Sequence, residues 1–254
     1  MKLYSKFTNK NKKLALLIDP DKTEIIKAKQ IVKEASDCGY SFIFVGGSLI
    51  SEPIDDYIIK LKVNSSIPIV LFPGSPFQLS KHADGLLLLS LISGRNPEYL
   101  IGNHVISAPI IKKYKIETIP TGYILVNSGI VSSTEYISNT TAIPSDKIDL
   151  IVATAIAGEM LGLKLIYLES GSGATKPINI DLIKEIRKNI SIPLLVGGGI
   201  SMPKQLSDIF NAGADIAVIG TAIEKNFKMI SLLRAHHKNT LADSLLLKLQ
   251  NSCA

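Results

Sequence analysis

Short apolar runs alternate with longer helical patterns along most of the chain. Most of these runs are apolar throughout, without a polar residue at every second position, as expected for parallel strands buried on both faces. The predicted strands are Leu14–Ile18, Phe42–Val45, Ile67–Phe72, Gly85–Leu89, Gly122–Val126, Lys164–Leu168, Pro193–Val196 and Asp215–Ile219. The helical patterns between them include Thr23–Ser36, Pro97–Lys113, Ser145–Leu161, Ile180–Lys188 and Pro203–Ala212.

This alternation of strands and helices indicates the fold class. Strands and helices follow one another without a linker, which predicts an α/β protein with a single domain over residues 1–254. The expected architecture is a closed (β/α)8 barrel of the TIM type. A doubly wound open sheet is the alternative, but such a sheet more often has six strands or a second domain.

One interval departs from the alternation. Between Phe72 and Gly85 the chain reads PGSPFQLSKHAD, which is too short and too rich in proline for a full crossover helix with its loops. The third helix of the barrel is therefore expected to be missing or reduced to a turn, which leaves an opening in the barrel wall. We expect the N-terminal segment MKLYSKFTNKNKK to lead directly into the first strand.

Composition excludes several classes of protein. The 254 residues are 46% hydrophobic with a mean hydropathy of +0.27, which excludes extensive disorder. Two cysteines, Cys38 and Cys253, cannot form a disulfide scaffold or a cysteine-based zinc site, and they fit a cytoplasmic location. The apolar stretch 148–168 contains Asp149, Glu159 and Lys164, so we expect a buried helix and a strand there, with no transmembrane segment.

The charge pattern points to small anions as partners. The chain has 28 Lys and Arg against 22 Asp and Glu, a formal net charge of +6. These basic residues are scattered and form no stripe interleaved with aromatic residues, so no nucleic-acid partner is expected. An anionic small substrate accounts for a mild excess of positive charge equally well.

Glycine-rich loops follow three of the last predicted strands. They are Gly171-Ser172-Gly173, Gly197-Gly198-Gly199 and Gly220-Thr221. The carboxyl ends of barrel strands carry the active site, and the loops after the seventh and eighth strands are a frequent phosphate site. Backbone N–H groups hold a phosphate best where no side chain intrudes. Glycines also permit tight turns, but three such loops at one end of the barrel favour phosphate binding.

Two acidic residues directly follow predicted strands. Asp19 offers a hard oxygen ligand suited to Mg²⁺, to which the Ser48 hydroxyl would add a weak contact; the alternative is capping of the next helix, a role that suits Asp21 and Thr23 better. Glu169 is placed to accept a proton from a substrate hydroxyl. It is equally placed to hold the glycine loop beside it, and the sequence leaves both roles open.

Six motifs, read in order, resemble one known family. LLIDPDK at 16–22, FVGGS at 44–48, FPGS at 72–75, YLESGSGA at 167–174, VGGGI at 196–200 and IGTAIE at 219–224 are similar to the geranylgeranylglyceryl phosphate synthase family. The resemblance covers nearly the whole chain and is closer to the larger branch found in many archaea and some bacteria. The related heptaprenylglyceryl phosphate synthases carry a lysine two positions before the metal aspartate, where this chain has Leu17.

The resemblance implies a barrel without its third helix and a Mg²⁺-dependent prenyltransferase. In this reaction the C3 hydroxyl of sn-glycerol 1-phosphate attacks C1 of a long prenyl diphosphate, which forms an ether lipid precursor and releases pyrophosphate. Asp19 and Ser48 would bind Mg²⁺ with the diphosphate, and Glu169 would be the catalytic base. The residues implied to bind glycerol phosphate are Tyr167, Leu168, Glu169, Ser170, Gly171, Ser172, Gly173, Gly198, Gly199, Gly220 and Thr221.

Some positions leave the function open. The family commonly has Gly-Asn where this chain has Gly220-Thr221, so an amide side-chain contact to phosphate is lost while backbone contacts remain. A phosphosugar isomerase or lyase on the same barrel is an alternative, with Lys22 and Glu169 as its candidate residues. A heptaprenyl-specific synthase is another alternative, and a phosphate or lipid carrier without catalysis is a third.

The sequence also suggests where a prenyl chain and a partner subunit would lie. The opening left by the missing helix would form a groove, with Phe72, Pro73, Phe77, Leu79 and Leu91 as candidate lining residues. The length of the prenyl chain does not follow from these residues. Because the 145–161 helix is apolar, we expect a homo-oligomer, a dimer or larger.

Overall fold

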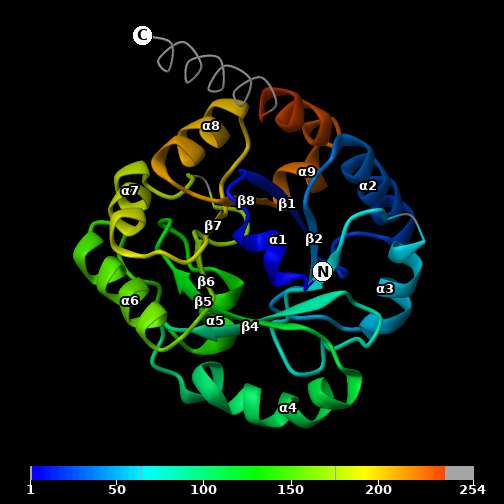
Figure 1. Ribbon diagram of the computed structural model, residues 1–254, viewed down its shortest axis with the longest axis horizontal. Coiled ribbons are helices and arrows are strands. Elements are labelled where there is room, and N and C mark those ends of the chain that lie inside the picture. The colour runs from blue at the N-terminus through cyan, green and yellow to red at the C-terminus, as the bar shows by residue number, and fades with distance from the viewer. Residues whose placement is uncertain (1, 64, 175, 238–254) are drawn as a thin grey trace.

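The protein forms a closed barrel of parallel strands surrounded by helices, as its computed structural model shows (Figure 1). The structure describes residues 2–63, 65–174 and 176–237, so Cys253 lies outside the described part. Neighbouring strands in the chain are neighbours in the barrel, and β8 closes the ring on β1. The strands are β1 (Lys13–Ile18), β2 (Phe42–Val45), β3 (Ile69–Leu71), β4 (Gly85–Leu91), β5 (Thr118–Leu125), β6 (Leu165–Glu169), β7 (Leu194–Gly197) and β8 (Ile216–Ile219). The predicted fold class is confirmed.

Helices form the outer ring in Figure 1. Those on the predicted helical patterns bury one apolar side against the barrel; in α7, Leu182, Ile183 and Ile186 are buried. The helices that follow the first strand are α2 (Ile25–Cys38), α3 (Ile54–Lys62), a π-helical turn η1 (Glu98–Gly102), α4 (Asn103–Tyr114), α5 (Ser133–Ser138), α6 (Ile148–Met160), α7 (Ile180–Asn189), α8 (Pro203–Ala212) and α9 (Thr221–Lys225). Residues 229–237 are also helical.

The segment between β3 and β4 contains no helix, as predicted. Residues 72–84 instead form loops and turns. Gln78 holds this segment against the loop after β2, because its side-chain oxygen accepts the Gly74 N–H at 3.0 Å and the Gly47 N–H at 3.3 Å, while its amide donates to the Gly47 carbonyl at 2.8 Å. The barrel wall therefore lacks a helical cover here, and a cavity takes its place.

The apolar stretch 148–168 is a helix followed by a strand, as predicted. It forms α6 and β6, with the turn at Gly162 between them. Within the described ranges, no helix is both long enough and apolar enough to cross a membrane.

The N-terminal segment does not lead directly into the first strand. A short helix, α1 (Tyr4–Thr8), precedes β1. Phe7 on this helix is fully buried, and its ring stacks on the Phe42 ring with centroids 4.1 Å apart. The Glu117 carboxylate accepts the N–H groups of Leu3 and Tyr4 at 2.7 and 2.8 Å. Because Phe42 begins β2 and Glu117 directly precedes β5, α1 closes the amino end of the barrel.

Removing the buried Phe7 ring tests its contribution to stability. We expect Phe7→Ala to lower the free energy of unfolding by about 3–5 kcal/mol, because a buried aromatic side chain is deleted and a cavity remains. Phe77→Ala is the matched control, since the Phe77 side chain is 93% exposed, and it should change stability by less than about 0.5 kcal/mol. Urea unfolding measures the free energy of unfolding of both variants. Equal decreases in the two variants would contradict the stabilising role of the buried Phe7 ring.

A candidate active site at the carboxyl ends of the strands

A polar cavity of about 610 Å³ opens at the carboxyl ends of the barrel strands. Most of the residues predicted for the site line it. They are Asp19, Ser48, Tyr167, Glu169, Gly171, Ser172, Gly173, Gly198, Gly199, Gly220 and Thr221. Leu168 and Ser170 do not line it. The Leu168 side chain is fully buried in the core layer between barrel and helices, and the backbone N–H of Ser170 donates to the Gly197 carbonyl at 3.3 Å.

Glu169 lies at the end of β6 with its carboxylate held from two sides. The Tyr167 hydroxyl donates to Oε2 at 2.7 Å, and the Gly171 N–H donates to Oε1 at 2.9 Å. Burial raises the pKa of Glu169, and these two hydrogen bonds oppose that shift. Burial also raises the pKa of Tyr167, which keeps its hydroxyl protonated as a donor. The carboxylate is therefore held in one orientation and fixes the glycine loop.

The raised pKa of Glu169 has a consequence for stability. A carboxyl group with a raised pKa binds its proton more tightly in the folded state, so its contribution to stability is present at acidic pH and is lost as pH rises. The Glu169→Gln variant has no carboxyl group at this position, so its stability does not fall for this reason as pH rises. The difference in unfolding free energy between the variant and the parent should therefore grow in the variant's favour from pH 4 to pH 8. Urea unfolding across this range measures it, and a difference that shrinks would contradict the shift.

The loop after β7 requires glycine at its first two positions. Gly198 and Gly199 have φ angles of +83° and +68°. A Cβ on Gly198 would collide with the Ser170 hydroxyl and the Glu169 carboxylate, and one on Gly199 would collide with the Lys176 carbonyl. These two positions therefore present backbone rather than side chains to the cavity, which suits an anion held by N–H groups.

Asp19 lies on another wall of the cavity, directly after β1. Its side chain is 13% exposed and its Oδ2 pairs with Lys22 Nζ at 2.8 Å. Gly47 faces it closely, because a Cβ there would lie 3.0 Å from the carboxylate atoms. Asp21 does not cap helix α2. Its carboxylate instead accepts the Ser51 N–H at 2.9 and 3.2 Å and ties two loops together.

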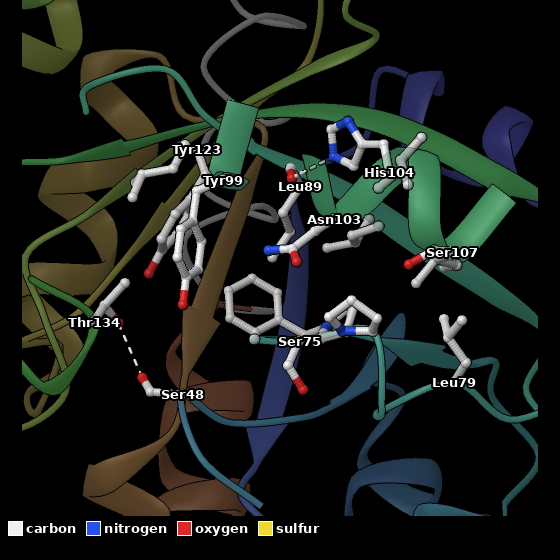
Figure 2. A pocket seen from close by; sticks show the side chains of 18 of the residues that line it. Ser48, Ser75, Leu79, Leu89, Tyr99, Asn103, His104, Ser107, Tyr123 and Thr134 are labelled. Atoms are coloured by element: carbon white, nitrogen blue, oxygen red, sulfur yellow. Dashed lines mark hydrogen bonds between the residues drawn. The ribbon is translucent and has the colours of Figure 1, made fainter. Parts of the chain in front are cut away.

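A second, mostly apolar cavity adjoins the polar one (Figure 2). It lies between β4, the helix-free segment 72–84 and the inner side of α4. Ser48 and Thr134 lie at one end of it in Figure 2, and Ser107 and Leu79 at the other. The residues that line both cavities are Gly47, Ser48, Phe72, Tyr123, Thr134 and Ile137.

The candidate groove residues are largely confirmed as lining this apolar cavity. Phe72, Pro73, Leu79 and Leu91 line it. Phe77 does not, because its side chain points to solvent and is 93% exposed. The wider wall includes polar groups that the sequence did not single out, among them His104, whose Nε2 lies 2.8 Å from the Leu89 carbonyl oxygen.

Sequence reasoning also missed two residues at the junction of the cavities. Tyr123 pairs in register with Tyr167 across β5 and β6, and their rings meet edge to face with centroids 5.3 Å apart. Tyr123 could have been found from its position opposite Tyr167 in the neighbouring strand, because this pairing places both tyrosines inside the barrel. Thr134 lies in α5, where its Oγ1 is 3.0 Å from Ser48 Oγ. No pattern in the sequence pointed to it.

A (β/α)8 barrel with a glycine-lined polar cavity at its carboxyl end and an apolar cavity beside it defines a class of enzyme for phosphorylated substrates with an apolar part. Residues 7–237 match the model of the PcrB family, and the chain belongs to that family. It is a prenyltransferase.

Curated relatives named geranylgeranylglyceryl phosphate synthase match most of the chain. The Chitinophaga pinensis protein is 47% identical over 234 residues, which cover 90% of this chain and 93% of the relative. The Flavobacterium johnsoniae protein is 48% identical over 86% of this chain and 90% of its own. The Pyrococcus horikoshii protein is 40% identical over 83% of each.

The solved structures that resemble this chain agree with the curated relatives. The (S)-3-O-geranylgeranylglyceryl phosphate synthase of Thermoplasma acidophilum, in complex with its substrate sn-glycerol-1-phosphate, superposes with a TM-score of 0.87 at 29% identity, over 93% of this chain and 97% of that one. An N-acetylmannosamine-6-phosphate 2-epimerase from Clostridium perfringens, at 15% identity and a TM-score of 0.56 over 85% and 90%, shares the fold alone.

Proposed function

We propose that this protein transfers a geranylgeranyl group from its diphosphate to the C3 hydroxyl of sn-glycerol 1-phosphate. The observation that carries the proposal is the shared wall: a glycine-lined polar cavity and a mostly apolar cavity are lined in part by the same residues. The relatives' names and the substrate bound to the Thermoplasma acidophilum enzyme support the same reaction. The Lys22 ammonium group is paired with Asp19, which disfavours the isomerase or lyase alternative that has Lys22 as a candidate residue.

The acceptor fits the polar cavity. Its phosphate group would lie against the backbone of the glycine loops, including Gly173, Gly199 and Gly220. Anchoring at the phosphate places the glycerol hydroxyls toward the buried Glu169 carboxylate. Glu169 takes the proton of the C3 hydroxyl, the oxygen forms a bond to C1 of the prenyl group, and the bond from C1 to the diphosphate breaks. Ether and pyrophosphate are the products.

The donor would place its apolar chain in the apolar cavity and its diphosphate near Asp19. Mg²⁺ suits this position, because it commonly binds one or two carboxylates together with substrate phosphates. The missing side chain at Gly47 leaves space directly against the Asp19 carboxylate. In our proposal Asp19 and Ser48 hold the ion, which would neutralise charge on the leaving diphosphate.

Product formation tests the proposal directly. Labelled prenyl diphosphates of increasing length are incubated with sn-glycerol 1-phosphate, with Mg²⁺ and with a chelator, and sn-glycerol 3-phosphate is the control acceptor. We expect ether product from the 1-phosphate, loss of that product with chelator, and the highest rate with the geranylgeranyl donor. A preference for heptaprenyl diphosphate would show that this longer diphosphate is the donor. If no donor gave ether product, the proposed function would be wrong.

A homo-oligomer and a cytoplasmic location are part of the proposal. Several apolar side chains are exposed on the outer ring, with Met160 and Leu161 at the end of α6 81% and 78% exposed. Apolar surface of this kind favours contact between copies of the chain. Light scattering should give at least twice the mass of one chain, and a monomer at micromolar concentration would contradict the prediction. The cytoplasmic location rests on cysteine use alone.

A further inference from the structure

Thr134 lies at the point where the polar and apolar cavities meet. It lines both, although it belongs to α5 in the long connection between β5 and α6. Its hydroxyl lies 3.0 Å from Ser48 Oγ, the contact drawn as a dashed line in Figure 2. Tyr123, on β5, also lines both cavities. Thr134 therefore joins α5 to the loop that follows β2.

Helix α5 holds Thr134 in a fixed position. The Ser132 hydroxyl accepts the Glu135 N–H at 3.2 Å, and Glu135 Oε2 accepts the Ser132 N–H at 2.9 Å, which forms a capping box around Thr134. Glu135 Oε1 also accepts the Ala142 N–H at 2.8 Å, and Glu135 is buried. This network ties a six-residue helix, which would be unstable alone, to the chain that follows it.

The position of Thr134 matters because of the chemistry that must occur beside it. A donor whose chain fills the apolar cavity and whose diphosphate lies in the polar cavity has its C1 at the shared wall. Water at that place competes with the acceptor: its oxygen bonds to C1, the bond from C1 to the diphosphate breaks, and a proton passes to solvent. The products are then a prenyl alcohol and pyrophosphate instead of the ether.

We propose that Thr134 is a positioning residue that excludes water from C1. By bonding to Ser48, it holds α5 against the loop after β2 around the donor and directs the prenyl group to the acceptor hydroxyl. Ile137, on the same helix and the same wall, adds apolar cover. This inference rests on the proposed function, since it concerns how the same reaction avoids hydrolysis.

The ratio of ether to prenyl alcohol tests the inference. Labelled geranylgeranyl diphosphate and saturating sn-glycerol 1-phosphate are used, and both products are counted. We expect Thr134→Val, which keeps the shape but loses the hydroxyl, to shift the ratio about tenfold toward alcohol, the size of effect of one lost hydrogen bond. Thr134→Ser should restore the parent ratio. Tyr136→Ala is the control, because this side chain on the same helix is 85% exposed.

A second variant keeps the test decisive even if Thr134→Val fails to fold. Tyr123→Phe removes another hydroxyl from the junction of the two cavities, and we expect it to raise the share of alcohol as well. Unchanged ratios in both variants, with a parent enzyme that forms ether, would overturn the role of Thr134 and leave the proposed function intact. A parent enzyme that forms no ether would overturn both the role and the function.

Discussion

Glu169→Gln should lower kcat for ether formation by about 100- to 10,000-fold, the range of a general base. The change keeps the size of the side chain but removes its ability to take the proton of the acceptor hydroxyl. The KM for sn-glycerol 1-phosphate should change much less, because the phosphate contacts lie on the glycine loops. Steady-state kinetics gives the rates, and calorimetry with sn-glycerol 1-phosphate shows whether the site still binds.

Tyr167→Phe is the variant to compare with Glu169→Gln. It removes the hydroxyl that donates to Oε2 at 2.7 Å while the Gly171 N–H still holds Oε1. Because the carboxylate remains as a base and only its orientation loosens, we expect a smaller fall in kcat, about tenfold. If Glu169→Gln retained activity within tenfold of the parent, Glu169 would be the holder of the glycine loop and not the base.

The barrel itself was predictable because its strands carry a strong and simple signal. Parallel strands buried on both faces read as continuous apolar runs, and each of the predicted runs overlaps a strand. The largest discrepancy is β5, which begins at Thr118 and not at Gly122. Pro120 obscured its start, since proline is unusual inside a sheet; its carbonyl still accepts the Lys164 N–H at 2.7 Å.

Short helices and contacts between distant segments were not predictable in the same way. The five residues of α1 and the six of α5 are too few to show a helical period. Thr134 and Ser48 are 86 positions apart in the chain and meet only because the barrel brings two strand ends together. The glycine loops were found because the requirement for positive φ angles at Gly198 and Gly199 leaves a mark in the sequence itself.

Asp19→Asn should lower the rate of ether formation by about 1,000-fold, near the upper end for loss of one charge-stabilising group at a reaction centre. The change is isosteric and removes the carboxylate charge against which Gly47 leaves space. We expect binding of sn-glycerol 1-phosphate to persist, because the glycine loops lie on other walls of the cavity. The dependence of the rate on Mg²⁺ concentration should shift to higher concentrations, which distinguishes a lost ion ligand from a general structural defect.

Asp21→Asn separates the two carboxylates of the same loop. The Asp21 carboxylate accepts the Ser51 N–H, and an amide oxygen can accept the same hydrogen bond, so its rate and Mg²⁺ dependence should stay within a few-fold of the parent. Lys22 loses its partner in Asp19→Asn, so the melting temperature of both variants is measured alongside the rates. An Asp19→Asn protein that is folded, active and unchanged in its response to Mg²⁺ would show that the ion is held elsewhere, and the donor diphosphate with it.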